Sequence, residues 1–577
     1  MTLLPDDQVS LYLQAINPIA NLGEEARYLA AKKVAESLTV NDPLNGHAWL
    51  NLGKVLHQMG CKTEALASLQ KAIALAANDA EAHLYLGMCL VSLWRFEEAK
   101  ASYLQALALN STLAQAHNHL GQLLCLMNRH HDALDSYRSA LELEPEYHEA
   151  WLNLAILLTY QQQWSKAEAC YLRVLESNPN SVLALRNLGR LFEQLGIKQT
   201  DAIDYLERSI AIEPHADAYL TLSNLLMQCH QETKAWTMLR LAQSLRPLDT
   251  SPAKQAQADF SALLLDSPVA TSTPIDYLTS LAAYDRHLYC LIPDANVDID
   301  FLSAHADVVL NLITDADSGQ HVLPLALDLV ERLKRPTVNH PRLVMATDRA
   351  TVAERLAPIA QLHIPKTLRF QGLALISLAT AQQLTAYSLP VLVRLAGCHG
   401  GDDFIKCDDW HSLIDFVSLR PDAYYYLTQY INYRSIDGYF RKYRFISVNN
   451  ELLPYHLAIH NEWMVHHFRT DMTNQAWMRE EEQRFLNAPQ QVFNEAQLSA
   501  LQTAATAIAL DFCGIDCAIS HEGKVVIFEM NATMRVHDEK TELYAYKNPY
   551  IAKIKIAFDL MLARFAASAI KHQPRDE

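Results

Sequence analysis

The sequence predicts a multidomain protein in which an all-α superhelix of repeats precedes α/β domains. Its 577 residues are too many for one hydrophobic core. A 34-residue period runs through the chain as far as Pro247 and then stops. Beyond that point strand-like apolar runs alternate with helical ones, which is typical of α/β folds. We therefore expect a repeat superhelix over residues 1–249, a small α/β domain over 250–340 and a larger α/β (α+β) domain over 341–572.

Six similar hexapeptides define the repeat. The first reads "AWLNLG", and each of the six begins 34 residues after the one before. An alanine recurs 17 or 18 residues after each start, and the one longer step indicates an inserted residue near "GIKQ". Small residues at fixed positions let paired helices approach closely, and proline ends the second helix of a pair. The hexapeptides begin at Ala48, Ala82, Ala116, Ala150, Ala184 and Ala218, and the prolines that close units are Pro145, Pro179 and Pro214.

This pattern of W-x-x-L-G, alanine and proline at a 34-residue period resembles the tetratricopeptide repeat. The resemblance covers six units and a partial one before Pro43. It implies helix pairs stacked into a superhelix with a concave groove, and a role in binding a peptide or protein partner.

One position of each hexapeptide, just before the Leu-Gly pair, tends to face the groove in families with this repeat. Three asparagines at this position resemble the ladder by which some such superhelices hold a peptide backbone, since each amide can both donate and accept a hydrogen bond. The alternative is that these side chains are solvated groove residues. The position holds Asn51, Tyr85, His119, Asn153, Asn187 and Thr221.

Composition excludes some classes of function. The formal net charge of −17 argues against a general nucleic-acid binder, because binding to phosphates needs clustered Lys and Arg. The first residues lack a basic stretch followed by an apolar one, and no apolar run is long enough to cross a membrane, so we expect a cytoplasmic location without membrane insertion. The ten cysteines are scattered, which predicts free thiols.

Glycines cluster where "LPVLVRLAGCHGGDDFIKC" predicts a strand, a loop and a second strand. Gly397, Gly400 and Gly401 fall within five positions of a chain that has only 16 glycines. Clustered glycines let backbone N–H groups approach phosphate, although a plain hairpin turn would also account for them. A cationic strand follows, with Arg444 inside "YRFISV".

A hairpin near the C-terminus carries two carboxylates. "GIDCAIS" and "KVVIFEMN" are strand-like runs that "HEGK" joins. If Glu522 and Gly523 form a two-residue turn, paired positions sum to 1045 and Asp516 lies opposite Glu529, while Asn531 shares their face. Two close carboxylates repel each other, and a hard cation such as Mg²⁺ would offset the repulsion. The alternative is a longer turn with solvated acids at the strand ends.

In this order, the glycine loop, cationic strand and carboxylate hairpin of residues 251–570 resemble the ATP-grasp superfamily. The resemblance implies an ATP-grasp fold after a small α/β domain that helps to bind substrate. It implies that Asp516, Glu529 and Asn531 hold Mg²⁺ on the phosphates of ATP. It further implies a flap over the phosphates at His399, Gly400 and Gly401, a hinge strand whose backbone meets adenine at Gln429, Tyr430 and Ile431, and contacts to phosphate, acyl phosphate or substrate carboxylate from Arg444 and Arg535.

The chain departs from the family pattern at two cations. Where two lysines usually bind the nucleotide phosphates, the matching residues are Arg349 and Arg394. Arginine keeps the charge but presents a planar fork, so the two residue types are not equivalent. Gln429 also stands where glutamate is frequent.

The resemblance implies a Mg²⁺-ATP-dependent carboxylate–amine ligase that works through an acyl phosphate. The groove would recruit a peptide or protein substrate, with a small molecule or amino acid as a further co-substrate. Two alternatives remain open. One is an interaction scaffold whose nucleotide-binding domain is inactive or regulatory, and the other is an ATP-grasp phosphotransferase.

Overall fold

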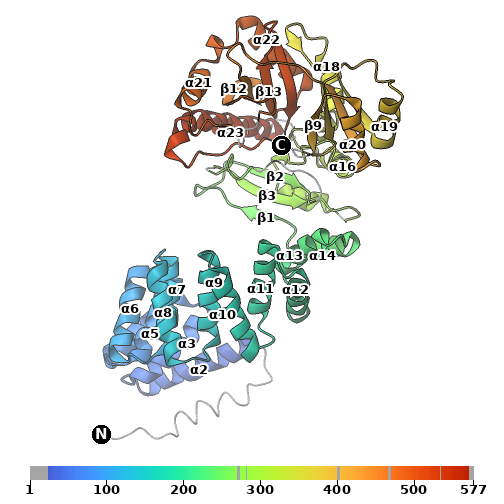
Figure 1. The fold of residues 1–577 in the computed structure, drawn as a ribbon. Helices are drawn as coiled ribbons and strands as arrows, with labels where there is room; N and C mark the ends of the chain where they lie inside the picture. The colour runs from blue at the N-terminus through green and yellow to red at the C-terminus, as the bar shows by residue number, and fades with distance from the viewer. Residues whose placement is uncertain are drawn as a thin grey trace. The chain divides into compact units, whose positions relative to one another are not determined.

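The computed structural model describes residues 24–268, 273, 275–280, 282–295, 297–398, 403–465, 470–532 and 534–570. The chain divides into two compact units, Met1–Met238 and Leu239–Glu577, which are coloured from blue to red along the chain in Figure 1. The boundary lies inside the last repeat helix. All ten cysteines are free thiols, as the sequence predicts. Among the described residues, no helix has both the length and the apolar character needed to cross a membrane.

The described part of the first unit contains six helix pairs, and α2 (Glu24–Asn41) before them is the predicted partial repeat. The 34-residue period is visible in the helix starts. The first helices of the pairs are α3 (Gly46–Gln58), α5 (Ala80–Ser92), α7 (Ala114–Leu126), α9 (His148–Tyr160), α11 (Val182–Leu195) and α13 (Ala216–Gln228). The second helices are α4 (Lys62–Leu75), α6 (Phe96–Leu109), α8 (His130–Leu143), α10 (Trp164–Ser177), α12 (Gln199–Ile212) and α14 (Glu232–Leu245).

Small residues set the distance between the two helices of a pair. A Cβ atom added to Gly121 would lie 2.6 Å from a ring carbon of Tyr137, and one added to Gly87 would lie 2.4 Å from a ring carbon of Tyr103. Both tyrosines are about 2% exposed, so their rings cannot move away without disturbing the core. The repeated glycine is therefore required for close packing.

Successive first helices, such as α7 and α9, pack against each other, whereas successive second helices make weaker contact. The stack therefore curves with the first helices on its inner side.

The second unit begins with a sheet of order β1-β3-β2-β4-β5, in which every pair except β1–β3 is parallel. The sequence predicts this short parallel sheet. Its strands are β1 (Asp249–Ser251), β2 (Ser261–Asp266), β3 (Asp285–Cys290), β4 (Val308–Asn311) and β5 (Thr337–Val338), with helices α15 (Ile299–Ala304) and α16 (Leu323–Leu333) between them.

Two further sheets follow. A four-stranded antiparallel sheet has the order β7-β10-β8-β9, and a five-stranded sheet has the order β12-β11-β13-β14-β6, in which only β6 is parallel to its neighbour. The first contains β7 (Thr367–Gln371), β8 (Val391–Leu395), β9 (Phe404–Cys407) and β10 (Tyr424–Gln429), with α19 (Gly372–Thr380) and α20 (Trp410–Ser418). The second contains β6 (Leu362–His363), β11 (Phe440–Val448), β12 (Glu451–His460), β13 (Phe512–Ile519) and β14 (Val525–Asn531). The helices of this region are α17 (Pro341–Val344), α18 (Arg349–Leu356), α21 (Ala476–Asn487), α22 (Glu495–Ile508) and α23 (Asn548–Ile570).

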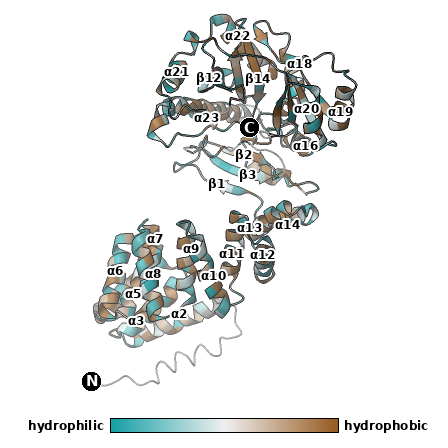
Figure 2. Cartoon of the chain, in the orientation of Figure 1, coloured by the Kyte–Doolittle hydropathy of each residue, from teal (hydrophilic) through white to brown (hydrophobic). Residues whose placement is uncertain are grey.

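The cores of these sheets differ in extent. One cluster of buried side chains joins the parallel sheet to the five-stranded sheet, for example Val309 with Phe445 and Ile515. The four-stranded sheet has a core of its own, which includes Val393 and Leu427. Figure 2 shows the apolar strands of this unit in brown. The four-stranded layer is thus a separately packed element beside a larger body.

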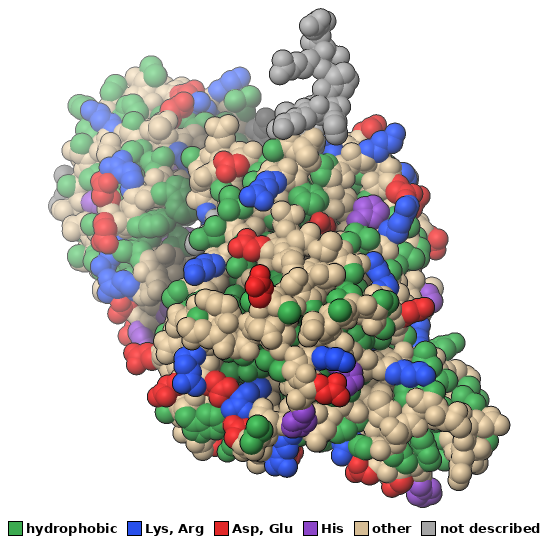
Figure 3. Space-filling view, turned by 90° about the horizontal axis from the view of Figure 1, so that it is seen from above, with side chains coloured by type: hydrophobic (Ala, Val, Ile, Leu, Met, Phe, Trp, Pro, Cys, Tyr) green, Lys and Arg blue, Asp and Glu red, His purple; other side chains and the backbone are tan. Residues whose placement is uncertain are grey.

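Charges of both signs share the surface. On the face shown in Figure 3, the described basic side chains, in blue, lie interspersed with acidic ones, in red. Such a mixed surface agrees with the argument from net charge against a general nucleic-acid binder.

We expect Gly121→Val to lower the free energy of unfolding of the repeat unit by about 1–3 kcal/mol, because the added carbons overlap the buried Tyr137 ring. Urea unfolding followed by circular dichroism measures the change. The control is Gln115→Val at an exposed position of the same helix, which should cost only a few tenths of a kcal/mol. An equal loss in both variants would show that the contact with Tyr137 is not the cause.

Candidate functional site

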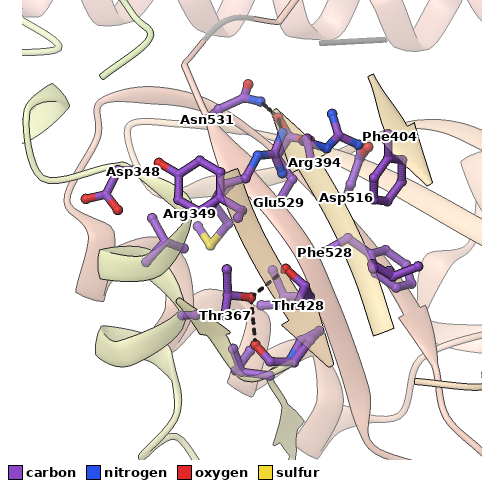
Figure 4. A pocket seen from close by; sticks show the side chains of 18 of the residues that line it. Asp348, Arg349, Thr367, Arg394, Phe404, Thr428, Asp516, Phe528, Glu529 and Asn531 are labelled. Carbon is purple, nitrogen blue, oxygen red and sulfur yellow. Dashed lines mark hydrogen bonds and ion pairs between the residues drawn. The ribbon is translucent and has the colours of Figure 1, made fainter. Parts of the chain in front are cut away.

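A cavity of about 350 Å³ lies in the second unit, where residues of the two antiparallel sheets and of the segment after β4 come together (Figure 4). Its volume falls in the range of small-molecule sites, about 300–1,000 Å³. One part of its wall carries charged side chains from β8, α18, β11, β13 and β14, and another part carries aromatic and aliphatic side chains.

The carboxylate hairpin forms part of this wall, and its turn differs from the prediction. Ser520 N donates to Lys524 O (2.8 Å), so the loop holds the three residues 521–523, with Gly523 at φ +72°. Pairs next to the loop, such as Ile519 with Val525, therefore sum to 1044 and not to 1045. The prediction of a two-residue turn at Glu522–Gly523 was wrong, because a three-residue loop that ends on a left-handed glycine is the next most common hairpin.

A second irregularity restores the predicted pairing. The register shifts between Asp516 and Cys517, so that Phe528 is an extra residue on β14, as in a β-bulge. Asp516 consequently pairs with Glu529, and Gly514 pairs with Asn531. The predicted juxtaposition of Asp516 and Glu529 is thus present, through a loop and a bulge whose effects on the register cancel.

Asp516 is buried and bound by two cations from β11. Arg444 donates to both of its oxygens, with Nη2 2.8 Å from Oδ2, and Lys442 Nζ lies 3.0 Å from Oδ2. Burial alone would raise the pKa of Asp516, but Arg444 and Lys442 hold it well below the usual range. The cations that offset the charge of this carboxylate are therefore side chains of the chain itself. Lys442 and Arg444 are two positions apart in a strand, so the sequence indicates that their side chains share one face of the sheet. Of the two, only Arg444 is a predicted site residue.

Glu529 is bound by Arg349 and Asn531. Arg349, the first residue of α18, places Nη2 3.0 Å from Glu529 Oε1, and the Asn531 amide donates to the same oxygen. The Oδ1 atom of Asn531 is buried and has no hydrogen-bond partner in the described structure. No group of three or more His, Cys, Asp or Glu side chains within the described ranges could hold a metal ion. A metal at this point would accordingly need the amide oxygen as well as the two carboxylates.

Arg394 lies beside this pair on the opposing sheet. Its guanidinium carbon is 4.0 Å from the centre of the Phe404 ring, and Nη1 donates to Cys398 O (3.2 Å). Among the described residues no carboxylate forms an ion pair with it. Burial, together with the nearby Arg349, lowers the pKa of Arg394 to about 10. Arg394 is therefore a half-buried cation in the cavity wall with which no described carboxylate pairs, and Figure 4 shows it near Arg349 and Glu529.

The apolar part of the wall contains the predicted hinge. Tyr430 and Ile431 line the cavity, together with Phe404, Trp463 and Phe528. Phe404 and Trp463 are in edge contact, with ring centres 5.4 Å apart. The aromatic residues outside the hinge were not found from the sequence, because only the pairing of distant strands brings them together.

Gln429 also lines the cavity, but its side chain is held by the chain before β8. The amide donates to Ser388 O (2.8 Å) and accepts from Ser388 N (2.9 Å). The side-chain amide is therefore engaged within the protein, and the backbone N–H of this residue also donates a hydrogen bond, to Lys366 O (2.9 Å).

Asp317 comes from the loop after β4 and was not predicted. It accepts hydrogen bonds from the Tyr426 hydroxyl at 2.9 and 2.8 Å and lies 3.3 Å from Arg369 Nη2. These bonds tie the parallel-sheet region to the four-stranded sheet at the cavity wall. Burial raises the pKa of Asp317 despite Tyr426 and Arg369.

The remaining predicted cavity residues divide into two groups. Arg535 lines the cavity with an exposed side chain, whose guanidinium carbon is 5.5 Å from the centre of the Tyr277 ring. His399, Gly400 and Gly401 lie outside the described residues.

In the repeat unit, only some of the side chains at the predicted groove position are available to a ligand. Asn153 donates to Asn118 Oδ1 (3.0 Å), and Asn118 donates to the Tyr147 hydroxyl (3.3 Å). His119 is hydrogen-bonded to Gln122, Tyr85 lies under the Lys54 ammonium, and Asn51 and Asn187 are partly exposed. Asn118 was missed, although it is an asparagine where four of the other repeats have leucine.

Comparisons with known proteins concern the repeats. Models of the tetratricopeptide repeat match residues 22–80, 80–112 and 124–189, so the N-terminal region contains tetratricopeptide repeats. Among solved structures, PilF of Pseudomonas aeruginosa is 21% identical, over 35% of this chain and 92% of that chain, with a TM-score of 0.33. YrrB, described as a TPR protein with an unusual peptide-binding site, is 22% identical, over 32% of this chain and 94% of that chain, with a TM-score of 0.27. No curated protein matches the sequence.

We expect Arg444→Gln to destabilise the second unit by about 3 kcal/mol at pH 7, because Asp516 then keeps only Lys442 as a partner. In the wild type the folded pKa of Asp516 is below its unfolded value, so the ion pair stabilises the fold at neutral pH and its contribution is lost as the pH falls below about 4. The difference in unfolding free energy between the wild type and the Arg444→Gln variant should therefore become smaller as the pH falls. Urea unfolding at several pH values measures it, with the exposed Arg332→Gln on α16 as control. A difference that does not change with pH would contradict the assignment to Asp516.

Proposed function

We propose that the second unit is an ATP-grasp enzyme, which binds Mg²⁺-ATP in the cavity and joins a carboxylate to an amine. The observation that carries the proposal is Arg394, a half-buried guanidinium in the cavity wall with no ion pair among the described residues. A buried cation is stable only when an anion or strong acceptors compensate it. The phosphates of a nucleotide would supply that anion, and the planar guanidinium matches phosphate oxygens.

The cavity wall has a charged part and an aromatic and aliphatic part, and this division favours a nucleotide over a simple anion as the ligand. A nucleotide has an apolar planar base at one end and a charged phosphate chain at the other. Tyr430, Trp463 and Phe528 offer aromatic and aliphatic surface for the base, while Arg349 and Arg394 lie in the charged part. The backbone at Gln429–Ile431 is the candidate for hydrogen bonds to the base, since the Gln429 side chain is already bound to Ser388.

The hairpin residues fit a magnesium ion. Asn531 Oδ1 is a buried acceptor without a donor, and it belongs to the residue that binds the Glu529 carboxylate. Carboxylate and amide oxygens suit Mg²⁺, which also takes substrate phosphate oxygens as ligands. Glu529 and Asn531 would hold the ion, and Asp516 lies beside them on the neighbouring strand β13. The bound ion would neutralise part of the negative charge of the phosphates. Arg349 could then turn from Glu529 towards a phosphate. The electrostatic cost would be small, because the guanidinium would leave the Glu529 carboxylate and pair with another anion, the phosphate.

The proposed reaction needs no covalent enzyme nucleophile. The γ-phosphoryl group passes from ATP to a carboxylate oxygen and ADP is left. The amine nitrogen then forms the C–N bond while the C–O bond to phosphate breaks, and the nitrogen gives up a proton. Arg444, fixed by Asp516, and Arg535, exposed at the cavity wall, are the candidates to hold the acyl phosphate and the substrate carboxylate. The repeats would recruit the peptide or protein that carries one reacting group.

A scaffold with an inactive cavity is the second candidate. It is favoured by the ion pairs of Asp516 with Arg444 and of Glu529 with Arg349, which neutralise both carboxylates without a metal.

Removal of the Arg394 cation should weaken nucleotide binding. We expect Arg394→Ala to raise the Kd of a non-hydrolysable ATP analogue with Mg²⁺ by about 10-fold or more, as loss of a charge-assisted hydrogen bond predicts. Isothermal titration of the full-length protein measures the Kd. Arg332→Ala, on the exposed face of α16, is the matched control and should bind as the wild type does. Equal affinity of the Arg394 variant and the wild type, or no binding by the wild type, would contradict the proposal.

Turnover distinguishes the ligase from the alternatives. With Mg²⁺-ATP and candidate peptides, the protein should release ADP and phosphate, and mass spectrometry should show a new amide bond. We expect Glu529→Gln to reduce the rate by about 10²-fold or more while the analogue still binds, because the metal loses a charged ligand near the reacting phosphate. Glu522→Gln, in the loop of the same hairpin and exposed, is the control. A phosphorylated product without an amide bond would indicate a phosphotransferase, and binding without turnover on any acceptor would indicate the scaffold.

A further inference from the structure

The inner face of the repeats can be located on each first helix. In α9 the residues buried against the second helix include Ala150, Leu154 and Leu158. At 100° per residue the opposite side of this helix carries Leu152, Ile156 and Tyr160. Since the first helices line the inner side of the stack, this side faces the groove. We call the corresponding side of α7, α9 and α11 the inner stripe.

The inner stripe exposes large apolar side chains on three neighbouring helices. Leu126 on α7 is 58% exposed, Ile156 and Tyr160 on α9 are 44% and 69% exposed, and Leu183 on α11 is 45% exposed. Consecutive helices of this group pack against each other, so the four side chains belong to one continuous surface. Exposed apolar residues that gather in this way indicate a binding surface, whereas single ones do not.

Two arginines adjoin these residues. Arg186 lies three residues after Leu183 on α11, and Arg190 lies four residues after Arg186, so the three residues share one side of the helix. Neither forms an ion pair or a hydrogen bond to a side chain in the described structure. The other arginines from Gly46 to Met238 are all in ion pairs with carboxylates, namely Arg95, Arg129, Arg138, Arg173 and Arg208. Arg186 and Arg190 are thus the two arginines of this range that no carboxylate of the repeats pairs with.

We propose that the inner stripe of α7, α9 and α11 binds an acidic peptide segment that also carries large apolar side chains. The two arginines would pair with carboxylates of the peptide, and Ile156, Tyr160 and Leu183 would cover its apolar side chains. Asn187, next to Arg186, would bind the peptide backbone. This inference rests on the proposed partner-binding role of the repeats and does not depend on the nucleotide cavity.

The test uses the full-length protein without nucleotide and three fluorescein-labelled twelve-residue peptides. The first alternates Asp or Glu with Phe and Leu, the second has Lys in place of each acid, and the third keeps the acids but has Ser in place of Phe and Leu. Fluorescence anisotropy should show that the first binds about 10-fold tighter than either of the others. The double variant Arg186→Glu/Arg190→Glu should lose that affinity by about 10-fold, because an attraction becomes a repulsion at two sites.

Arg138→Glu is the matched control, since it makes the same kind of charge change on a second helix, where its side chain is 63% exposed. It should bind the first peptide as the wild type does, and circular dichroism should show the helix content of all variants unchanged. Equal binding of the acidic and basic peptides, or full affinity of the double variant, would overturn the inference while the partner-binding role stands. Absence of binding to all three peptides would overturn both. If the wild type and Arg138→Glu are dimers and only the double variant is a monomer, the surface binds a second copy of the chain and not a peptide.

Discussion

The second unit depends on the neutralisation of two carboxylates that its fold places face to face. Asp516 and Glu529 lie opposite each other on β13 and β14, and Asp516 is almost fully buried. Buried carboxylates at that separation destabilise a fold unless cations lie beside them. The cations come from distant segments of the chain, Lys442 and Arg444 from β11 and Arg349 from the start of α18. This requirement fixes how the hairpin, β11 and α18 are arranged, and it creates the charged part of the cavity.

Arg394 is the one exception in the charge balance of these groups. It is carried by the four-stranded sheet, which has its own core and faces the hairpin across the cavity. Asp317 and Tyr426 link that sheet to the parallel-sheet region. An anion between Arg394 and Arg349 would connect the separately packed layer to the larger body. A ligand at the proposed nucleotide site would therefore contact both layers.

The repeat unit is built on a different principle. Each helix pair repeats local contacts, and in four of the six pairs a glycine opposite a tyrosine or leucine sets the spacing, while Ala155 and Ser223 take its place in the other two. Residues that vary between the repeats lie on the inner stripe. Arg186 and Arg190 occupy this stripe, and so does Asn118, whose buried amide links Asn153 to Tyr147. The proposed binding surface thus lies on the side of the first helices opposite to the side that packs within the pair.

The sequence by itself determined the repeats and most of the elements of the second unit. A period of 34 residues, glycine and proline positions and alternating strand patterns are local properties, and they fixed the helix pairs, the short parallel sheet and the strands on either side of the glycine loop. They also placed Asp516 across from Glu529, although with the wrong turn, because a bulge at Phe528 cannot be read from one strand. Only the tertiary structure decided which cations neutralise these acids, that Arg394 has no ion pair with a described carboxylate, and that Phe404, Trp463 and Asp317 share one cavity. Those relations join residues far apart in the chain, and the free energy of burying charge appears only once the sheets are packed.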